Sequence, residues 1–213
     1  MATIFSDSFT VAADVNIEAY PATPDYSLMN GIAGDVKVNA ANDRVQAPTA
    51  GTKFRVRCLN AACPTGDQEV SVRGTSDSAT GVQTAVLARC HATLDDCYMM
   101  RINFDTNAME LWSYTLGIGS LIDTTASSYT SAGTHTYYLK AEGAGATVTL
   151  TFRIDALTPR VFADTSGARK TAGKAGLYLY NGTANTGWVD DFSVDDLIAG
   201  GSVANSYYYR ANQ

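Results

Sequence analysis

Apolar and polar side chains alternate with a period of two along most of this chain, which is the pattern of half-buried β-strands. Residues 148–154 show it clearly, because Val148, Leu150, Phe152 and Ile154 fall on one face with polar residues between them. No window shows the sustained 3.6-residue stripe that predicts a helix. The same alternation is found at residues 53–58, 69–74, 82–90, 98–104, 109–114 and 136–141.

Residues that favour turns separate these segments at regular intervals, at residues 64–67, 80–81, 105–107, 143–145 and 181–182. The pattern stops after Leu197, where Gly200 and Gly201 lead into a tyrosine-rich end. Many short strands with turns about every 8–12 residues predict a sandwich or a barrel. The chain is therefore predicted to be one all-β domain over residues 1–197, followed by a C-terminal arm over residues 198–213.

The composition agrees with strands and turns and excludes several partners. The chain has 213 residues, of which 46% are hydrophobic and 17% charged, so it can bury a core without a metal or a disulfide. A net charge of −6 without a basic tail argues against nucleic acid. No stretch approaches the roughly 20 apolar residues of a membrane-spanning helix. Residues 1–7 lack a basic segment leading into an apolar run, which predicts no signal peptide.

Three regions resemble the concanavalin A-like lectin and glucanase superfamily, in its laminin-G-like branch. The resemblance spans about residues 4–197 and implies a two-sheet antiparallel jelly-roll sandwich. It says little about activity, because a fold does not imply a function. The matching segments are residues 4–9 (IFSDSF), 133–139 (GTHTYYL) with 150–155 (LTFRID), and 173–182 (GKAGLYLYNG) with 188–194 (WVDDFSV).

The chain lacks the catalytic motif of the hydrolytic members that it resembles. Those enzymes carry Glu-x-Asp-x-x-Glu along one strand, which directs two carboxylates into the cleft of a retaining glycosidase. The histidines, His91 and His135, form no metal motif, and no nucleophile elbow or phosphate-binding loop is found. The sequence predicts that the protein is not an enzyme, and a glycoside hydrolase built from distant carboxylates is the alternative. None of the four glutamates begins a Glu-x-Asp: Glu18, Glu69, Glu110 and Glu142.

Four cysteines lie in one part of the chain, Cys58, Cys63, Cys90 and Cys97. If residues 53–104 form a four-strand meander, Cys58 and Cys90 lie about 9.5 Å apart, at two inter-strand spacings. A disulfide tolerates a Cα separation of only about 7 Å, so the predicted disulfides are Cys58–Cys63 and Cys90–Cys97. They would imply an oxidising location. A zinc site made by all four cysteines and four buried free thiols are the alternatives.

Polar and aromatic residues occupy the strand faces opposite the predicted core. The resemblance implies that sugars bind on the outward concave sheet, where rings stack on sugar C–H faces and polar groups read hydroxyls. The alternative is that the arginines are ordinary solvent-exposed strand residues and that a loop or a neighbouring subunit covers Trp112. The residues predicted to contact a ligand are Arg89, Arg101, Asn103, Trp112 and Tyr114.

A calcium site is predicted from the same resemblance, because many members hold a structural calcium between the first and last strands. Asp7 and Asp191 fall at the matching positions, and backbone carbonyls would complete the oxygen shell. The alternative is that both aspartates are ordinary turn or edge residues.

The C-terminal arm carries Tyr207, Tyr208, Tyr209 and Arg210, residue types that often anchor protein interfaces. Because Gly200 and Gly201 offer a hinge, the arm is predicted to dock on a neighbouring subunit. The alternative is that it packs on its own sandwich and covers a sheet edge.

These features predict a structural protein of a virion surface, such as a phage capsid decoration or fibre-associated protein with a lectin-like sandwich. The absence of a leader, the stand-alone domain, the low charge and the aromatic arm favour this function. Its predicted partners are capsid or tail proteins, neighbouring copies of itself and surface glycans, without nucleic acid or membrane. The alternative is a carbohydrate-binding module of a secreted bacterial protein, located outside the cell.

Overall fold

The computed structural model describes residues 2–20, 26–31, 35–46, 50–51, 53–62, 66–77, 80–103, 106, 108–126, 133–182 and 187–197. No helix in these ranges has the length and apolarity needed to cross a membrane. The elements are β1 (Ala2–Asp7), β2 (Val15–Asn16), η1 (Ile17–Ala19), β3 (Tyr26–Asn30), β4 (Lys37–Asn39), β5 (Arg44–Gln46), β6 (Lys53–Ala62), β7 (Gln68–Ser76), β8 (Gln83–Cys90), β9 (Cys97–Asn103), β10 (Ala108–Thr115), β11 (Ile118–Ala126), β12 (Gly133–Glu142), β13 (Val148–Ile154), β14 (Arg160–Asp164), β15 (Lys174–Tyr180) and β16 (Trp188–Asp196).

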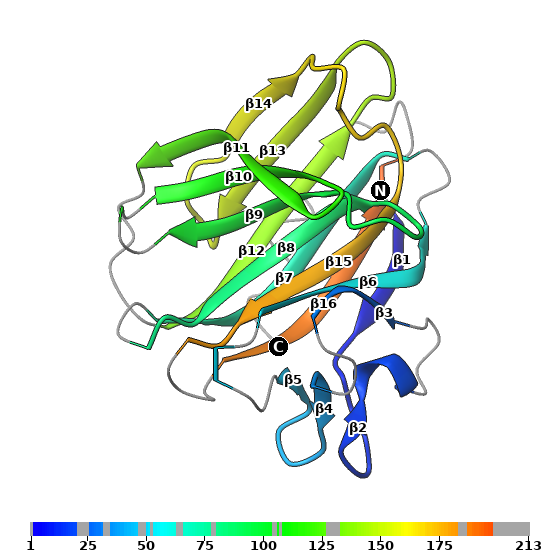
Figure 1. Cartoon of the computed structure of the whole chain (residues 1–213), viewed down its shortest axis with the longest axis vertical. Helices are drawn as coiled ribbons and strands as arrows, with labels where there is room; N and C mark the ends of the chain where they lie inside the picture. The colour runs from blue at the N-terminus through cyan, green and yellow to red at the C-terminus, as the bar shows by residue number, and fades with distance from the viewer. Residues whose placement is uncertain are drawn as a thin grey trace.

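The strands form two antiparallel sheets that pack on each other (Figure 1). Sheet A has the order β14-β13-β12-β7-β16-β5-β4-β2, with β1 also paired to β16. Sheet B has the order β11-β10-β9-β8-β15-β6-β3. Strand β15 lies between β6 and β8, so neighbours in the sheet come from distant parts of the chain, as in a jelly roll. The predicted all-β architecture of two sheets is confirmed.

The core between the sheets consists of the side chains that the period of two directs inward. In β13, Val148, Leu150, Phe152 and Ile154 are all fully buried, as the alternation predicted. Each such burial stabilises the fold by about 1.5–3 kcal/mol relative to an exposed side chain. The sandwich is therefore held by the apolar stripes that were visible in the sequence.

Among the β-bulges of the described strands, two change the direction in which predicted site residues point. The pairing of β15 with β8 shifts register beside Arg89, which has a φ of 52°. The pairing of β16 with β7 shifts between Asp190 and Ser193, and Asp191 between them has a φ of 46°. An inserted residue reverses the two-residue alternation from that point on. Both bulges fall on residues for which the sequence predicted a function.

The predicted arm over residues 198–213, with Tyr207, Tyr208, Tyr209 and Arg210, lies outside the described residues, as does Cys63. Its docking on a neighbouring subunit stays a prediction.

Candidate ligand-binding site

The outward face of sheet B carries a second side-chain cluster, separate from the core. Strand register sets one row across this face: Arg55 pairs with Tyr178, Tyr178 with Ala85, Ala85 with Arg101, and Arg101 with Glu110. We call this surface the outer face of sheet B. The other members of its apolar cluster are Leu87, Cys90, Cys97 and Met99, with Met29, Trp112, Tyr114 and Tyr180 packed against them.

Glu110 is the centre of a polar network on this face, and its carboxylate accepts hydrogen bonds from three side chains. Its Oε2 accepts from Nε of Arg101 at 2.9 Å and from Nε1 of Trp112 at 2.8 Å. Its Oε1 accepts from Nδ2 of Asn103 at 2.8 Å, and Nη1 of Arg101 also donates to Oε1 of Gln83 at 2.8 Å. These bonds fix the orientation of each member before any ligand arrives.

Burial by itself would raise the pKa of the Glu110 carboxyl, but its partners reverse that effect. Hydrogen bonds from Asn103 and Trp112 and the charge of Arg101 lower the pKa below its ordinary value of 4.5. The group is therefore an anion at neutral pH. It is suited to accept hydrogen bonds and poorly suited to donate a proton.

We expect a matching pH dependence of stability. Because the pKa of Glu110 is depressed by folding, its contribution is complete above about pH 4.5 and is lost as the pH falls through the folded-state value. Glu110→Gln should therefore be less stable than the parent at about pH 6, and the difference should shrink at about pH 3. Urea unfolding at both pH values measures it. A difference that is unchanged between them would contradict the assignment.

Two aromatic rings border the Glu110 network. The guanidinium carbon of Arg101 lies 4.9 Å from the ring centroid of Trp112, and that of Arg55 lies 4.1 Å from the centroid of Tyr114. The Trp112 and Tyr114 rings lie 6.4 Å apart, centroid to centroid, at an angle of 34°. Arg55 and Tyr114 belong to strands four positions apart, about 19 Å for a flat sheet. Their contact therefore spans the middle of the outer face.

The loop over residues 91–96 bridges one end of this face. On one side, Nη1 of Arg57 donates to the carbonyls of His91 at 3.2 Å and Leu94 at 3.3 Å. Both carboxylate oxygens of Asp95 accept from Arg55. On the other side, the backbone N–H of Gly117 donates to the carbonyl of Asp95 at 2.9 Å. The loop thus ties β6 to the β10–β11 turn.

The structure brings together four of the five predicted ligand residues, Arg101, Asn103, Trp112 and Tyr114, on the outer face of sheet B. Their contact with a ligand stays a prediction. Sequence reasoning missed Glu110 as the centre of the network, although the alternation had placed it on this face. A single carboxylate among arginines, an asparagine and a tryptophan was the available signal. No comparable indication in the sequence placed Gln83, Asp95 and Tyr178 on this face. They reach it only through the order of the strands and the path of the loop between β8 and β9.

Arg89 is the exception, and its predicted place on an exposed ligand face is wrong. Its side chain is fully buried, and the bulge beside it turns the side chain away from the outer face. Nε donates to the carbonyl of Gly66 at 3.1 Å, and Nη1 donates to the carbonyls of Gly143 at 2.7 Å and Lys170 at 2.8 Å. Nη2 lies 3.0 Å from Oδ1 of Asp67. Arg89 therefore joins three loops and has a structural role.

Asp7, a residue of the predicted calcium site, accepts three hydrogen bonds. Its Oδ1 accepts from the Phe9 N–H at 2.7 Å and the Tyr20 hydroxyl at 3.0 Å, and its Oδ2 accepts from the Tyr26 hydroxyl at 3.0 Å. Burial and the charge of Asp7 raise the pKa of Tyr26, which keeps that hydroxyl a donor. Each carboxylate oxygen of Asp7 thus accepts at least one hydrogen bond.

Asp191, the other predicted calcium ligand, pairs with Arg73, and its Oδ2 lies 2.8 Å from Nε of that residue. In the part of the chain that the structure describes, no group of three or more His, Cys, Asp or Glu side chains is placed to hold a metal ion. Calcium binding by Asp7 and Asp191 with backbone carbonyls stays a prediction.

The predicted Cys90–Cys97 disulfide is not formed, because both residues are buried free thiols. Burial and a hydrogen bond with Cys97 raise the pKa of the Cys90 thiol, which makes it a poor nucleophile. Cys58 is also buried. Its predicted partner, Cys63, lies outside the described residues, so that pairing stays a prediction.

No protein-family model and no curated protein matches this chain. A solved carbohydrate-binding module, CBM66 from Bacillus subtilis, is similar with a TM-score of 0.55 and 14% identity, covering 78% of this chain and 91% of the module. A Bacillus subtilis protein of unknown function with a galectin-like fold has a TM-score of 0.59 and 11% identity, covering 92% and 96%. The lectin UEA-II in complex with galactose has a TM-score of 0.52 and 10% identity, covering 91% and 98%.

At such identities the likeness shows the fold alone. The chain is a concanavalin A-like jelly-roll sandwich, the architecture that its first, middle and closing strands resembled in sequence. Lectins and carbohydrate-binding modules are among the proteins that share it.

Proposed function

We propose that this protein is a non-catalytic carbohydrate-binding module whose ligand lies on the outer face of sheet B. The observation that carries the proposal is the Glu110 network beside Trp112 and Tyr114. Aromatic rings that offer a face to sugar C–H groups, next to fixed hydrogen-bonding groups, are the chemistry of a sugar site. Because the polar members already hold one another, little side-chain entropy remains to be lost on binding.

The solved structures with the same fold support this ligand class. One is a carbohydrate-binding module, and another is a lectin in complex with galactose. They support a sugar as the ligand of this chain, while the kind of sugar depends on the side chains of the outer face.

Binding without cleavage follows from the state of the carboxylates on this face. A glycosidase needs a general acid with a raised pKa and a second carboxylate across the scissile bond. The pKa of Glu110 is lowered instead, and three donors occupy its oxygens. The neighbouring carboxylate, Asp95, is held by Arg55. We therefore infer that glycans are bound and released unchanged.

Glycan-array screening followed by calorimetry with the best binder tests the proposal. Trp112→Ala is expected to weaken that affinity at least tenfold, about 1.4 kcal/mol, because it removes a stacking ring and the donor that orients Glu110. Tyr138→Ala is the matched control: Tyr138 is a half-buried ring on sheet A, stacked by Arg153, and its loss should leave affinity unchanged. The proposal fails if the parent protein binds no glycan or if both variants lose affinity equally.

The location at a virion surface, with capsid or tail proteins as partners, is a further proposal that rests on the sequence alone. Mass spectrometry of purified particles from the producing culture tests it. Detection of this chain in stoichiometric amounts would support it, and its presence only in the particle-free fraction would overturn it.

A further inference from the structure

A cavity lies behind the β10–β11 hairpin, on the opposite side from the outer face of sheet B. It is a cleft of about 710 Å³ between β11 and β14, which are the last strands of sheets B and A along one side of the sandwich. Cavities of roughly 300–1,000 Å³ hold small-molecule ligands in other proteins. The cleft is therefore large enough for a ligand of its own.

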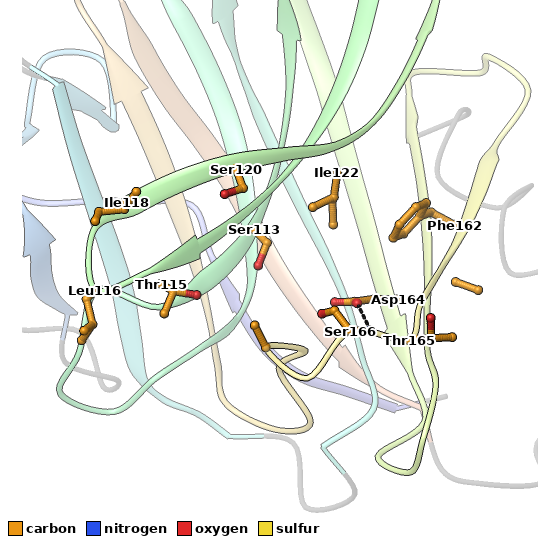
Figure 2. Close-up of a pocket in the computed structure, with 12 residues that line it drawn as sticks. Ser113, Thr115, Leu116, Ile118, Ser120, Ile122, Phe162, Asp164, Thr165 and Ser166 are labelled. Atoms are coloured by element: carbon orange, nitrogen blue, oxygen red, sulfur yellow. Dashed lines mark hydrogen bonds between the residues drawn. The ribbon is translucent and has the colours of Figure 1, made fainter.

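Apolar side chains form the inner wall and the mouth of this cleft. Figure 2 shows Ile122 of β11 and Phe162 of β14 directed into it, and both also pack against the core. At the mouth, Leu116 is 67% and Ile118 is 74% exposed. Side chains of this size gain free energy when a ligand covers them.

The polar part of the lining consists mostly of hydroxylated side chains. Ser113 and Ser120 face each other directly in the β10–β11 register. Asp164 is the one ionisable residue of the lining, and it is 5% exposed. Its Oδ2 accepts from the Tyr98 hydroxyl at 2.6 Å and its Oδ1 from the Ser166 N–H at 2.9 Å. The Asp164 carboxylate would repel an anionic ligand, which would also lose its hydration on entering the cleft.

Two polar contacts join the walls of the cleft. Nε of Arg160 on β14 donates to Oδ2 of Asp123 on β11 at 2.9 Å. Nζ of Lys170, in the segment after β14, donates to Oγ1 of Thr115 on β10 at 2.8 Å. These contacts fix the spacing of the two sheet edges, so the cleft is a preformed space.

From this lining we propose that the cleft binds a neutral amphipathic molecule, a medium-length alkyl or acyl chain with an uncharged hydroxylated head. The chain lies against Ile122 and Phe162 and covers Ile118, and the head meets the serine hydroxyls. This site is independent of the proposed glycan site, because the two lie on opposite faces of the same hairpin.

Calorimetric titration of the full chain with 1-monooctanoylglycerol, below its micelle concentration, tests the proposal. This probe has an acyl chain and a neutral head without a sugar ring, so it does not report on the glycan site. We expect saturable binding, at least tenfold weaker binding of octanoate, which carries a charge, and no binding of glycerol.

Two variants locate the binding. Ser120→Phe fills the cleft from an exposed position, and Ile118→Ser removes an apolar residue of the mouth; each should weaken binding at least tenfold. Leu94→Ser, at an exposed apolar residue of the 91–96 loop, and Trp112→Ala should bind normally. The proposal is overturned if monooctanoylglycerol does not bind, or if both cleft variants bind it like the parent. It is also overturned if light scattering shows a dimer that Ile118→Ser dissociates, because a second copy would then cover the cleft.

Discussion

Replacing Arg89 by Met is expected to lower the free energy of unfolding by about 3–5 kcal/mol. The methionine keeps an apolar side chain of similar length but leaves the carbonyls of Gly66, Gly143 and Lys170 without this donor. It also leaves Asp67 without the guanidinium that faces its carboxylate. Urea unfolding at neutral pH, followed by circular dichroism, measures the loss.

Arg160→Met is the matched control for this variant. Arg160 also pairs with an aspartate, Asp123, but its side chain is 50% exposed, so its loss should cost far less than the loss of Arg89. Equal losses in the two variants would show that Arg89 is no more important than a surface ion pair.

The second large effect is expected for Glu110→Ala, which should lower the free energy of unfolding by about 3 kcal/mol. The change leaves the Arg101 guanidinium, the Trp112 indole N–H and the Asn103 amide without their shared acceptor. Because the same bonds orient the site, glycan affinity should fall about a hundredfold, more than in Trp112→Ala. Unfolding in urea and calorimetry with the array-selected glycan measure the two effects.

Glu142→Ala serves as the control here. Glu142 pairs with Lys140 at the surface, so we expect a loss of less than about 1 kcal/mol and unchanged affinity. If Glu110→Ala unfolds at the same urea concentration as the parent, the network does not stabilise the face. If stability falls and affinity does not, the glycan lies elsewhere.

The alternation of side chains was enough to predict β6 to β10, β12 and β13, the core residues of β13 and the clustering of Arg101, Asn103, Trp112 and Tyr114, but not β2 to β5, β11 or β14. These four residues lie on the adjacent strands β9 and β10, so the period of two within each strand and local pairing bring them together. Such information is present in a short stretch of sequence.

The predictions failed where one extra residue, or a contact from far along the chain, decided the outcome. A bulge turned Arg89 inward, away from the outer face of sheet B. This bulge has no residue signature in the sequence. The cleft was invisible for a different reason: its walls, β11 and β14, become neighbours only when two sheets pack.

The position of Trp112 also means that the fluorescence of the protein can report ligand binding. The chain has two tryptophans. Trp188 is 9% exposed at the start of β16 in sheet A, with the guanidinium carbon of Arg44 4.0 Å from its ring centroid. Trp112 lies in the Glu110 network, with Arg101 over its ring. With Trp188 changed to phenylalanine, all indole fluorescence comes from Trp112 on the outer face of sheet B. The wavelength of that emission then changes when a ligand replaces water beside the Trp112 ring.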